Sequence, residues 1–142
     1  MTIKADLVEE LFSQLNCAQT VFGLHAEELE LNKETAFKIA SGFGGGMACA
    51  ETCGAVTGAY MVIGMKHGHF TSDPEAKAAT KQKIQQFNEK FKAEHSSLIC
   101  KELTGYDIST EEGAAAANNS GVFANKCLQL IKTACDILEK HF

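Results

Sequence analysis

The sequence lacks the patterns that mark several common classes of protein. Its 13 basic and 18 acidic residues are mixed along the chain without a basic block, which argues against nucleic acid or an anionic membrane as partner. The longest nearly apolar run, residues 53–65, is shorter than the roughly 20 residues of a membrane-spanning helix. The first segment is amphipathic and acidic, unlike a signal peptide. We therefore expect a cytoplasmic protein that binds neither nucleic acid nor membrane.

The strand-type alternation of apolar and polar residues is also absent, and the chain has a single proline. Apolar residues recur instead at three- and four-residue spacing, and Asp73-Pro74 is a typical helix start. We expect this start to open the longest helix. The polar, alanine-rich residues 110–121 are interpreted as a mobile loop. With 142 residues and no internal repeat or linker, we predict an all-α fold, a compact bundle or array of about five to seven helices in one domain, residues 1–142.

Six cysteines are present in a chain that is large enough to fold without disulfides. No CxxC pair occurs, so neither a thioredoxin-type motif nor a zinc ribbon is available, and no CxxCH motif offers covalent haem attachment. Surplus thiols in a cytosolic domain indicate metal binding, redox chemistry or simple burial.

Four of the cysteines follow residues that can cap a helix, so each is predicted to lie in a first helical turn; they are Cys17, Cys53, Cys100 and Cys127. Unpaired backbone N–H groups there would lower the pKa of a thiol and could hydrogen-bond to the sulfurs of a cluster, whereas burial would raise that pKa. Intervals of 36, 47 and 27 residues separate the four, so one common site requires the tertiary fold to bring them together.

The other two cysteines are predicted to differ from these four. Cys135 lies on an apolar helical stripe between Ile131 and Leu138, which favours core packing. Cys49 precedes Cys53 by four residues and would share a helical face with it only if the helix began before residue 47. Otherwise Cys49 belongs to a glycine-rich loop.

That loop forms part of residues 42–58, which contain six glycines and two cysteines. No strand precedes the stretch, and it has neither the GxGxxG spacing nor the Lys-Ser or Lys-Thr of phosphate-binding loops. Its glycines are better explained by a sharp turn into the next helix and by the approach of other backbone to Cys53. Gly54 and Gly58 would leave one face of that helix bare.

The segment CGAVTG at residues 53–58 has the form CGAxxG, preceded by SGFGGGM and accompanied by NCAQ, LICKELTG and NKC around the other three cysteines. The chain thus resembles the C_GCAxxG_C_C family of redox-active proteins from about residue 16 to residue 138. These are small bacterial and archaeal proteins. The resemblance implies that Cys17, Cys53, Cys100 and Cys127 are the characteristic cysteines and that Cys49 and Cys135 are extras. It implies redox activity without defining a reaction, and a similar domain in certain dihaem cytochromes carries a 2Fe-2S cluster.

Three functional hypotheses follow. In the first, Cys17, Cys53, Cys100 and Cys127 hold a 2Fe-2S cluster or another metal for electron transfer, with zinc as the structural alternative. In the second, no metal is bound, and Cys53 is the catalytic, low-pKa thiol that a second cysteine resolves: Cys17, Cys49, Cys100 or Cys127. In the third, the chain is a non-redox helical binding or assembly module. The sequence identifies no redox partner, and a homodimer is compatible with it.

Overall fold

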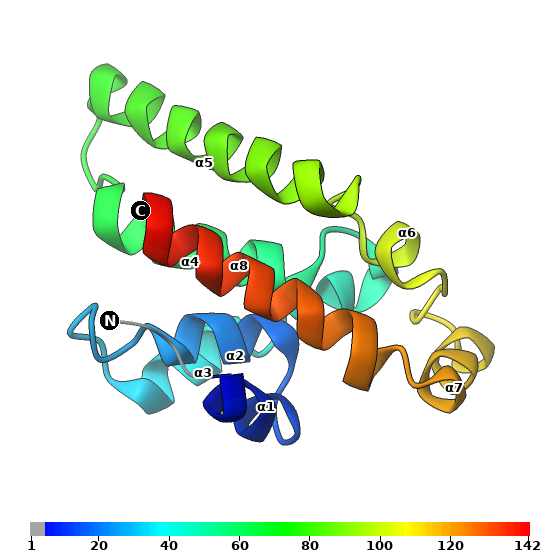
Figure 1. The fold of residues 1–142 in the computed structure, drawn as a ribbon. Coiled ribbons are helices and arrows are strands. Elements are labelled where there is room, and N and C mark those ends of the chain that lie inside the picture. The colour runs from blue at the N-terminus through cyan, green and yellow to red at the C-terminus, as the bar shows by residue number, and fades with distance from the viewer. Residues whose placement is uncertain (1–4) are drawn as a thin grey trace.

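The computed structural model describes residues 5–142 and shows an array of helices (Figure 1). The α-helices are α1 (Ala5–Phe12), α2 (Cys17–Leu24), α3 (Lys33–Ala40), α4 (Gly54–His67), α5 (Pro74–His95), α6 (Cys100–Thr104), α7 (Glu111–Ser120) and α8 (Leu128–His141). Two five-residue turns complete the path: η1 (Gly46–Ala50), whose backbone is largely left-handed, and η2 (Phe123–Cys127), which has wider, π-type geometry. No strand occurs in the described part of the chain, so the all-α prediction is confirmed. The predicted number of five to seven helices is too low.

Side-chain caps fix several helix starts where the sequence predicts them. The Asn16 side chain accepts a hydrogen bond from the Gln19 N–H, and the Gln19 side chain accepts one from the Asn16 N–H. Asn32 caps α3 in a similar way. Asp73 accepts hydrogen bonds from two backbone N–H groups of α5, the longest helix, and Pro74 occupies its first position. Each such cap contributes about 1 kcal/mol to stability.

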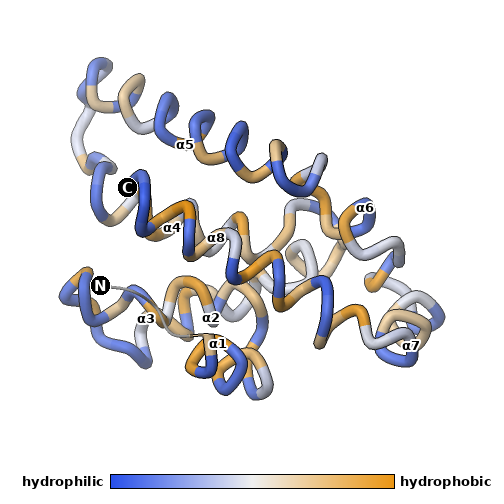
Figure 2. The backbone as a smooth tube through the Cα atoms, viewed as in Figure 1, coloured by the Kyte–Doolittle hydropathy of each residue, from blue (hydrophilic) through white to orange (hydrophobic). Residues whose placement is uncertain are grey.

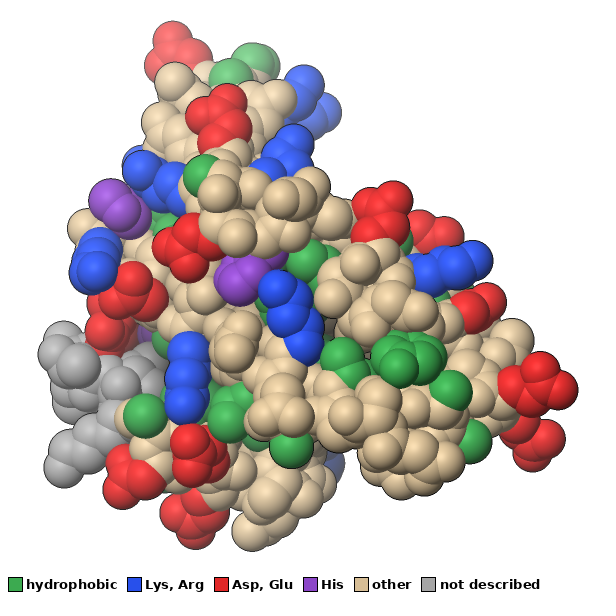
Figure 3. All heavy atoms as spheres, turned by 45° about the vertical axis from the view of Figure 1, so that its right-hand side comes forward, with side chains coloured by type: hydrophobic (Ala, Val, Ile, Leu, Met, Phe, Trp, Pro, Cys, Tyr) green, Lys and Arg blue, Asp and Glu red, His purple; other side chains and the backbone are tan. Residues whose placement is uncertain are grey.

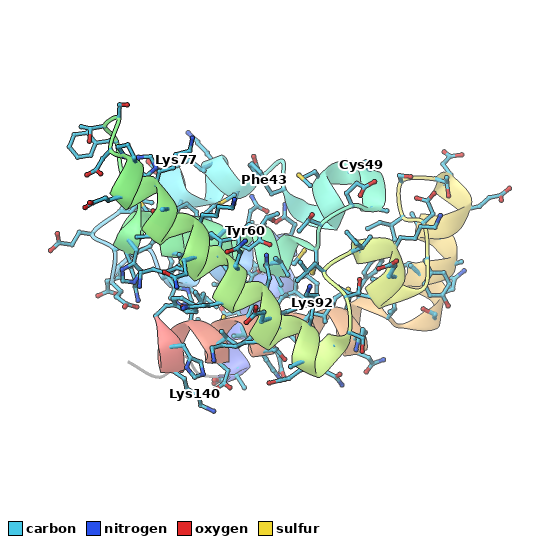
Figure 4. All side chains as sticks on the ribbon, turned by 90° about the horizontal axis from the view of Figure 1, so that it is seen from above. Phe43, Cys49, Tyr60, Lys77, Lys92 and Lys140 are labelled. Atoms are coloured by element: carbon cyan, nitrogen blue, oxygen red, sulfur yellow. The ribbon has the colours of Figure 1, made fainter. Side chains whose placement is uncertain are left out.

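Helix α4 lies at the centre of the fold, where α2, α5 and α8 pack against it (Figure 1). Its residues Ala59, Val62 and Ile63 are fully buried, as are Phe87 and Phe91 of α5. Figure 2 shows α5 as hydrophilic on its outer side, with hydrophobic positions toward the rest of the molecule. Burial of each phenylalanine contributes about 1.5–3 kcal/mol. The hydroxyl of Tyr60 on α4 also donates a hydrogen bond to Asn88 of α5, and Figure 4 shows Tyr60 beneath that helix.

The bare face of α4 permits a close contact with α2. A β-carbon built on Gly58 would lie 2.9 Å from the carbonyl oxygen of Ala18 and 3.0 Å from the β-carbon of Val21. Both distances are below ordinary van der Waals contact, so the two helices can approach this closely only with glycine at position 58. The predicted role of this glycine is thereby confirmed, and its partner is a helix of the same chain.

The interpretation of residues 110–121 as a mobile loop is wrong, because most of them form helix α7. The Thr110 hydroxyl accepts a hydrogen bond from the Gly113 N–H at 2.9 Å and caps the helix. Glu111 and Glu112 in the first turn complement the positive helix end, and the following run of alanines has high helix propensity. Gly121 ends the helix in a left-handed conformation, with φ of 80°.

Two surface properties bear on possible partners. Among residues 5–142, no helix combines the length and apolar character that crossing a membrane would demand. In the face of the molecule that Figure 3 shows, acidic and basic side chains are interspersed rather than gathered into a block of one sign.

Candidate functional site

The structure brings four cysteines to one cavity of about 440 Å³; they are Cys17, Cys53, Cys100 and Cys127. They belong to the start of α2, the residue before α4, the start of α6 and the end of η2. Helix α6, which Cys100 begins, lies beside α7 at one end of the fold (Figure 1). All six thiols of the chain are free.

A short backbone pairing holds Cys53 and Cys100 near each other. Thr52 and Ile99 form an antiparallel bridge. Beside it, the N–H of Cys53 donates to the Leu98 carbonyl at 2.8 Å, and the N–H of Cys100 donates to the Glu51 carbonyl at 2.6 Å. Thr52 therefore pairs with residue 99 instead of capping α4, and Cys53 itself occupies the cap position. Such a pairing of distant segments has no signal in the local sequence.

Cys17 reaches the cavity because α2 and α4 approach each other closely. A β-carbon on Gly54 would lie only 2.3 Å from the Cys17 sulfur, so this sulfur occupies the space that a side chain at position 54 would need. The capping interactions of Asn16 fix the first turn of α2, in which Cys17 is the first residue. The sequence motif CGAxxG thus places one cysteine and makes room for another.

Cys127 differs from its predicted position. It is the last residue of η2, where its N–H donates to the carbonyl of Val122 at 3.0 Å. Helical backbone angles continue from Val122 through Cys127 into α8. The prediction that Cys127 lies in a first helical turn is therefore wrong, and its backbone N–H is already used.

A left-handed turn of backbone borders the cavity at Gly45. Residues 45 to 48 all have φ between 59° and 61°, and the two that are not glycine are Met47 and Ala48. Each of these two costs about 1–2 kcal/mol relative to right-handed backbone. Gly46 is required in this turn, because a β-carbon there would lie 2.4 Å from the backbone nitrogen of Glu51 and 3.0 Å from the β-carbon of Cys100. The strained turn thus packs directly against a segment that carries a cavity cysteine.

Apolar side chains form much of the remaining wall, and the sequence analysis did not identify them; they are Phe12, Ile108, Phe123, Ala124 and Leu130. They come from α1, the α6–α7 connection, η2 and α8. A large apolar residue has the same sequence pattern whether it fills a core or lines a cavity. Only the tertiary structure distinguishes the two.

Burial dominates the ionisation of the cavity thiols. It raises the pKa of Cys53, and the nearby sulfurs of Cys17 and Cys100 raise it further. The N–H groups of Ala55 and Val56 lower the pKa of Cys53, but they offset only part of the effect of burial. The Cys53 side chain accepts no capping hydrogen bond. The prediction that the Cys53 thiol has a low pKa is therefore wrong for the metal-free protein.

The same cause acts on two further thiols of the cavity. Burial, followed by the Cys17 sulfur, raises the pKa of Cys100 to about 11 and that of Cys127 to about 12. The Cys17 sulfur contributes to the upward pKa shifts of Cys53, Cys100 and Cys127 alike.

The two remaining cysteines lie outside this cavity. Cys49 is exposed on η1, where its thiol donates to the Gly46 carbonyl at 3.1 Å, and Figure 4 shows it on this outlying turn. Because α4 begins at Gly54, the loop alternative for Cys49 is the correct one. Cys135 is 4% exposed within α8, which confirms its predicted place in the core.

The side chains of the cavity can be compared with the needs of a metal centre. In the described part of the chain, no group of three His, Cys, Asp or Glu side chains is arranged to hold a single metal ion. A mononuclear tetrahedral site holds each sulfur about 2.3 Å from one ion, which requires close convergence. Four cysteine thiolates are the donor set of a 2Fe-2S cluster and of a structural zinc site alike, so the donor chemistry of the cavity lining is compatible with either.

Comparison with known proteins yields one match. The family model described as "Putative redox-active protein (C_GCAxxG_C_C)" matches residues 15–141. Searches of curated proteins and of solved structures give no match. The matched range includes all four cavity cysteines.

Proposed function

This chain belongs to the C_GCAxxG_C_C family, described as redox-active, and from this premise we propose that it binds a 2Fe-2S cluster for electron transfer. Its ligands would be the thiolates of Cys17, Cys53, Cys100 and Cys127. The observation that carries the proposal is the convergence of these four thiols on one cavity from separate elements of the fold. Four cysteine thiolates are the complete protein ligand set of such a cluster.

The cavity suits a centre that exchanges electrons. When bound, the cluster would supply a one-electron redox couple. The apolar wall that includes Phe12 and Phe123 would keep water from the sulfurs, and the N–H groups at the start of α4 would favour the more negative, reduced state. With four protein ligands, no coordination position is left for a substrate, which favours electron transfer over catalysis.

The second candidate is thiol–disulfide exchange without metal. It is favoured by the presence of four free thiols in the lining of one cavity. Formation of a disulfide would release two electrons and two protons, and an external disulfide would accept them. Two facts argue against this candidate. A protonated thiol is a weak nucleophile, and burial raises the pKa of three of the four cavity cysteines, which favours their protonated form.

Anaerobic purification followed by iron, sulfide and zinc analysis and an absorption spectrum tests the proposal. We expect iron and sulfide in equal amounts and visible charge-transfer bands, both lost in Cys53→Ser. The matched control is Cys135→Ser, which replaces an equally buried cysteine outside the cavity and should keep the bands. Cys49→Ser should also keep them.

The other outcomes decide between the alternatives. A colourless wild type with a disulfide among the four cavity cysteines would support thiol–disulfide exchange. Zinc without iron would make the site structural. A protein with neither metal nor disulfide, in which no thiol reacts faster than an ordinary exposed one, would contradict both redox candidates and leave the helical binding module.

A further inference from the structure

The cysteine cavity has more room than its sulfurs account for. Its volume is about 440 Å³, and a water molecule takes up about 30 Å³ in the liquid, so it has room for roughly fifteen waters. A 2Fe-2S cluster would add only two iron and two sulfide atoms to the protein sulfurs. Pockets that bind organic ligands range from about 300 to 1,000 Å³. The volume therefore lies in the range of a small-molecule site.

The lining of this cavity carries no ionised side chain. Among its described residues, none is Lys, Arg, His, Asp or Glu. Burial raises the pKa of Cys100 to about 11 and that of Cys127 to about 12, so both thiols are uncharged at neutral pH. A charged ligand would lose its hydration here without gaining an ionic partner. The lining therefore favours a neutral occupant.

The two polar side chains of the lining, Asn16 and Thr104, are already hydrogen-bonded within the protein. The Asn16 side chain accepts from the Gln19 N–H at 2.8 Å and donates to the Ser41 carbonyl at 3.0 Å. The Thr104 hydroxyl donates to the Cys100 carbonyl at 2.8 Å. A ligand rich in hydroxyl or amide groups would leave its own polar groups unpaired, which costs free energy.

The remaining contact surface is apolar and in part aromatic. Phe12 of α1, Ile108 of the α6–α7 connection and Phe123 of η2 line the cavity, and all three are only partly buried. Such side chains gain free energy when a ligand covers them, and aromatic rings pack favourably on one another in offset or edge-to-face arrangements. This surface favours an apolar ligand that contains an aromatic ring.

We propose that the cavity binds a neutral, apolar organic molecule with an aromatic ring, held against Phe12, Ile108 and Phe123. Nucleotides, sugars and organic acids do not belong to this class, because their charged or hydroxyl groups would find no partner in the lining. The inference goes beyond the proposed function and needs no bound metal, since it rests only on side chains of this chain.

A matched pair of fluorescent probes tests the class of ligand in the full metal-free chain. N-phenyl-1-naphthylamine is neutral, and 1-anilinonaphthalene-8-sulfonate has the same ring system with one negative charge. Fluorescence titration should show saturable binding of one neutral probe per chain, at least about tenfold tighter than binding of the charged probe. Equal or tighter binding of the charged probe would overturn the inference, as would the lack of saturable binding of the neutral one.

Cysteine alkylation, followed by mass spectrometry, tests where the probe binds. Cys17 and Cys127 line the cavity and are partly buried, whereas Cys49 is exposed outside it. Saturating neutral probe should slow alkylation of Cys17 and Cys127 and leave that of Cys49 unchanged. Equal slowing at all three cysteines, or no slowing at Cys17 and Cys127, would contradict binding in the cavity.

Two phenylalanine variants supply a matched control. Phe123→Ser removes part of the apolar wall and should weaken binding of the neutral probe about tenfold or more. Phe70→Ser makes the same change at a side chain that is 99% exposed outside the cavity, and it should bind as wild type. If thermal unfolding shows that Phe123→Ser does not fold, Ile108→Ser takes its place. Wild-type affinity in the folded cavity variant would overturn the inference, whatever the iron content of the protein proves to be.

Discussion

The substitution Gly54→Ala tests whether the close approach of α2 and α4 places the Cys17 sulfur. The added β-carbon would lie 2.3 Å from that sulfur and 3.1 Å from the backbone nitrogen of Ala18. Neither distance is compatible with an undisturbed structure, so either the Cys17 side chain turns away or α2 moves outward. Both responses displace one of the four cavity thiols.

The expected loss of stability follows from overpacking. Forcing one extra carbon into a packed contact costs about 1–3 kcal/mol, and the higher helix propensity of alanine offsets up to about 1 kcal/mol of this. We expect the free energy of unfolding to fall by about 1–2 kcal/mol. For a chain of this length, each kcal/mol lowers the melting temperature by about 4 °C. The iron content should fall as well.

The same helix offers two controls for this variant. Gly58→Ala strains the same helix contact, because its β-carbon would lie 2.9 Å from the Ala18 carbonyl oxygen, but it touches no sulfur. It should lower stability and retain iron. Gly64→Ala has no atom within 4 Å of its β-carbon and should raise stability by about 0.5–1 kcal/mol.

Thermal or urea unfolding combined with iron and sulfide analysis measures all three variants. Wild-type stability and iron content in Gly54→Ala would refute the reasoning. So would a loss of iron in Gly58→Ala as large as in Gly54→Ala, since the loss would then report strain between the helices rather than contact with the sulfur.

Two further predictions concern protonation. In metal-free protein at neutral pH, mass spectrometry should find the exposed Cys49 alkylated before Cys100. Because burial raises the pKa of Cys100 to about 11, alkylation of Cys100 should accelerate as the pH approaches 11. Faster alkylation of Cys100 than of Cys49 at neutral pH would contradict this prediction. His25 is buried and donates through Nδ1 to the Val21 carbonyl, and burial lowers its pKa despite the raising effects of that bond and of the Glu28 carboxylate. The neutral His25 side chain therefore makes its full contribution to stability above the unfolded pKa of about 6.5, and this contribution is lost as the pH falls below about 6.5. Urea unfolding of His25→Leu should show a weaker pH dependence of stability below about pH 6.5 than urea unfolding of the wild type. An equal pH dependence in the two proteins would contradict this prediction.

Local signals predicted much of the fold. Asn16, Asn32 and Asp73 start helices where their side chains indicate, because a cap depends on residues only two or three positions away. The weakly apolar sequence of α7 resembles a disordered segment, although Thr110 and the alanines favour a helix on their own. In that segment the cap and the helix propensity of alanine outweigh the lack of an apolar stripe.

The site itself was predictable only in part. The four cysteines could be named from the capping pattern and the resemblance, but their convergence depends on the pairing of Thr52 with Ile99 and on the contact of Cys17 with Gly54. Both contacts join residues far apart in sequence. The direction of the pKa shift at Cys53 was wrong because the effect of a helix start is local, whereas burial depends on which elements cover the thiol.

X-ray absorption at the iron edge of anaerobically purified protein tests the central claim most directly, because it reports the atoms bound to the metal. The account predicts iron surrounded by sulfur alone, with a second iron at close distance and equivalent spectra for wild type and Cys135→Ser. Iron bound by nitrogen or oxygen, or a spectrum that Cys53→Ser leaves unchanged, would contradict the claim that the four cavity cysteines hold a cluster.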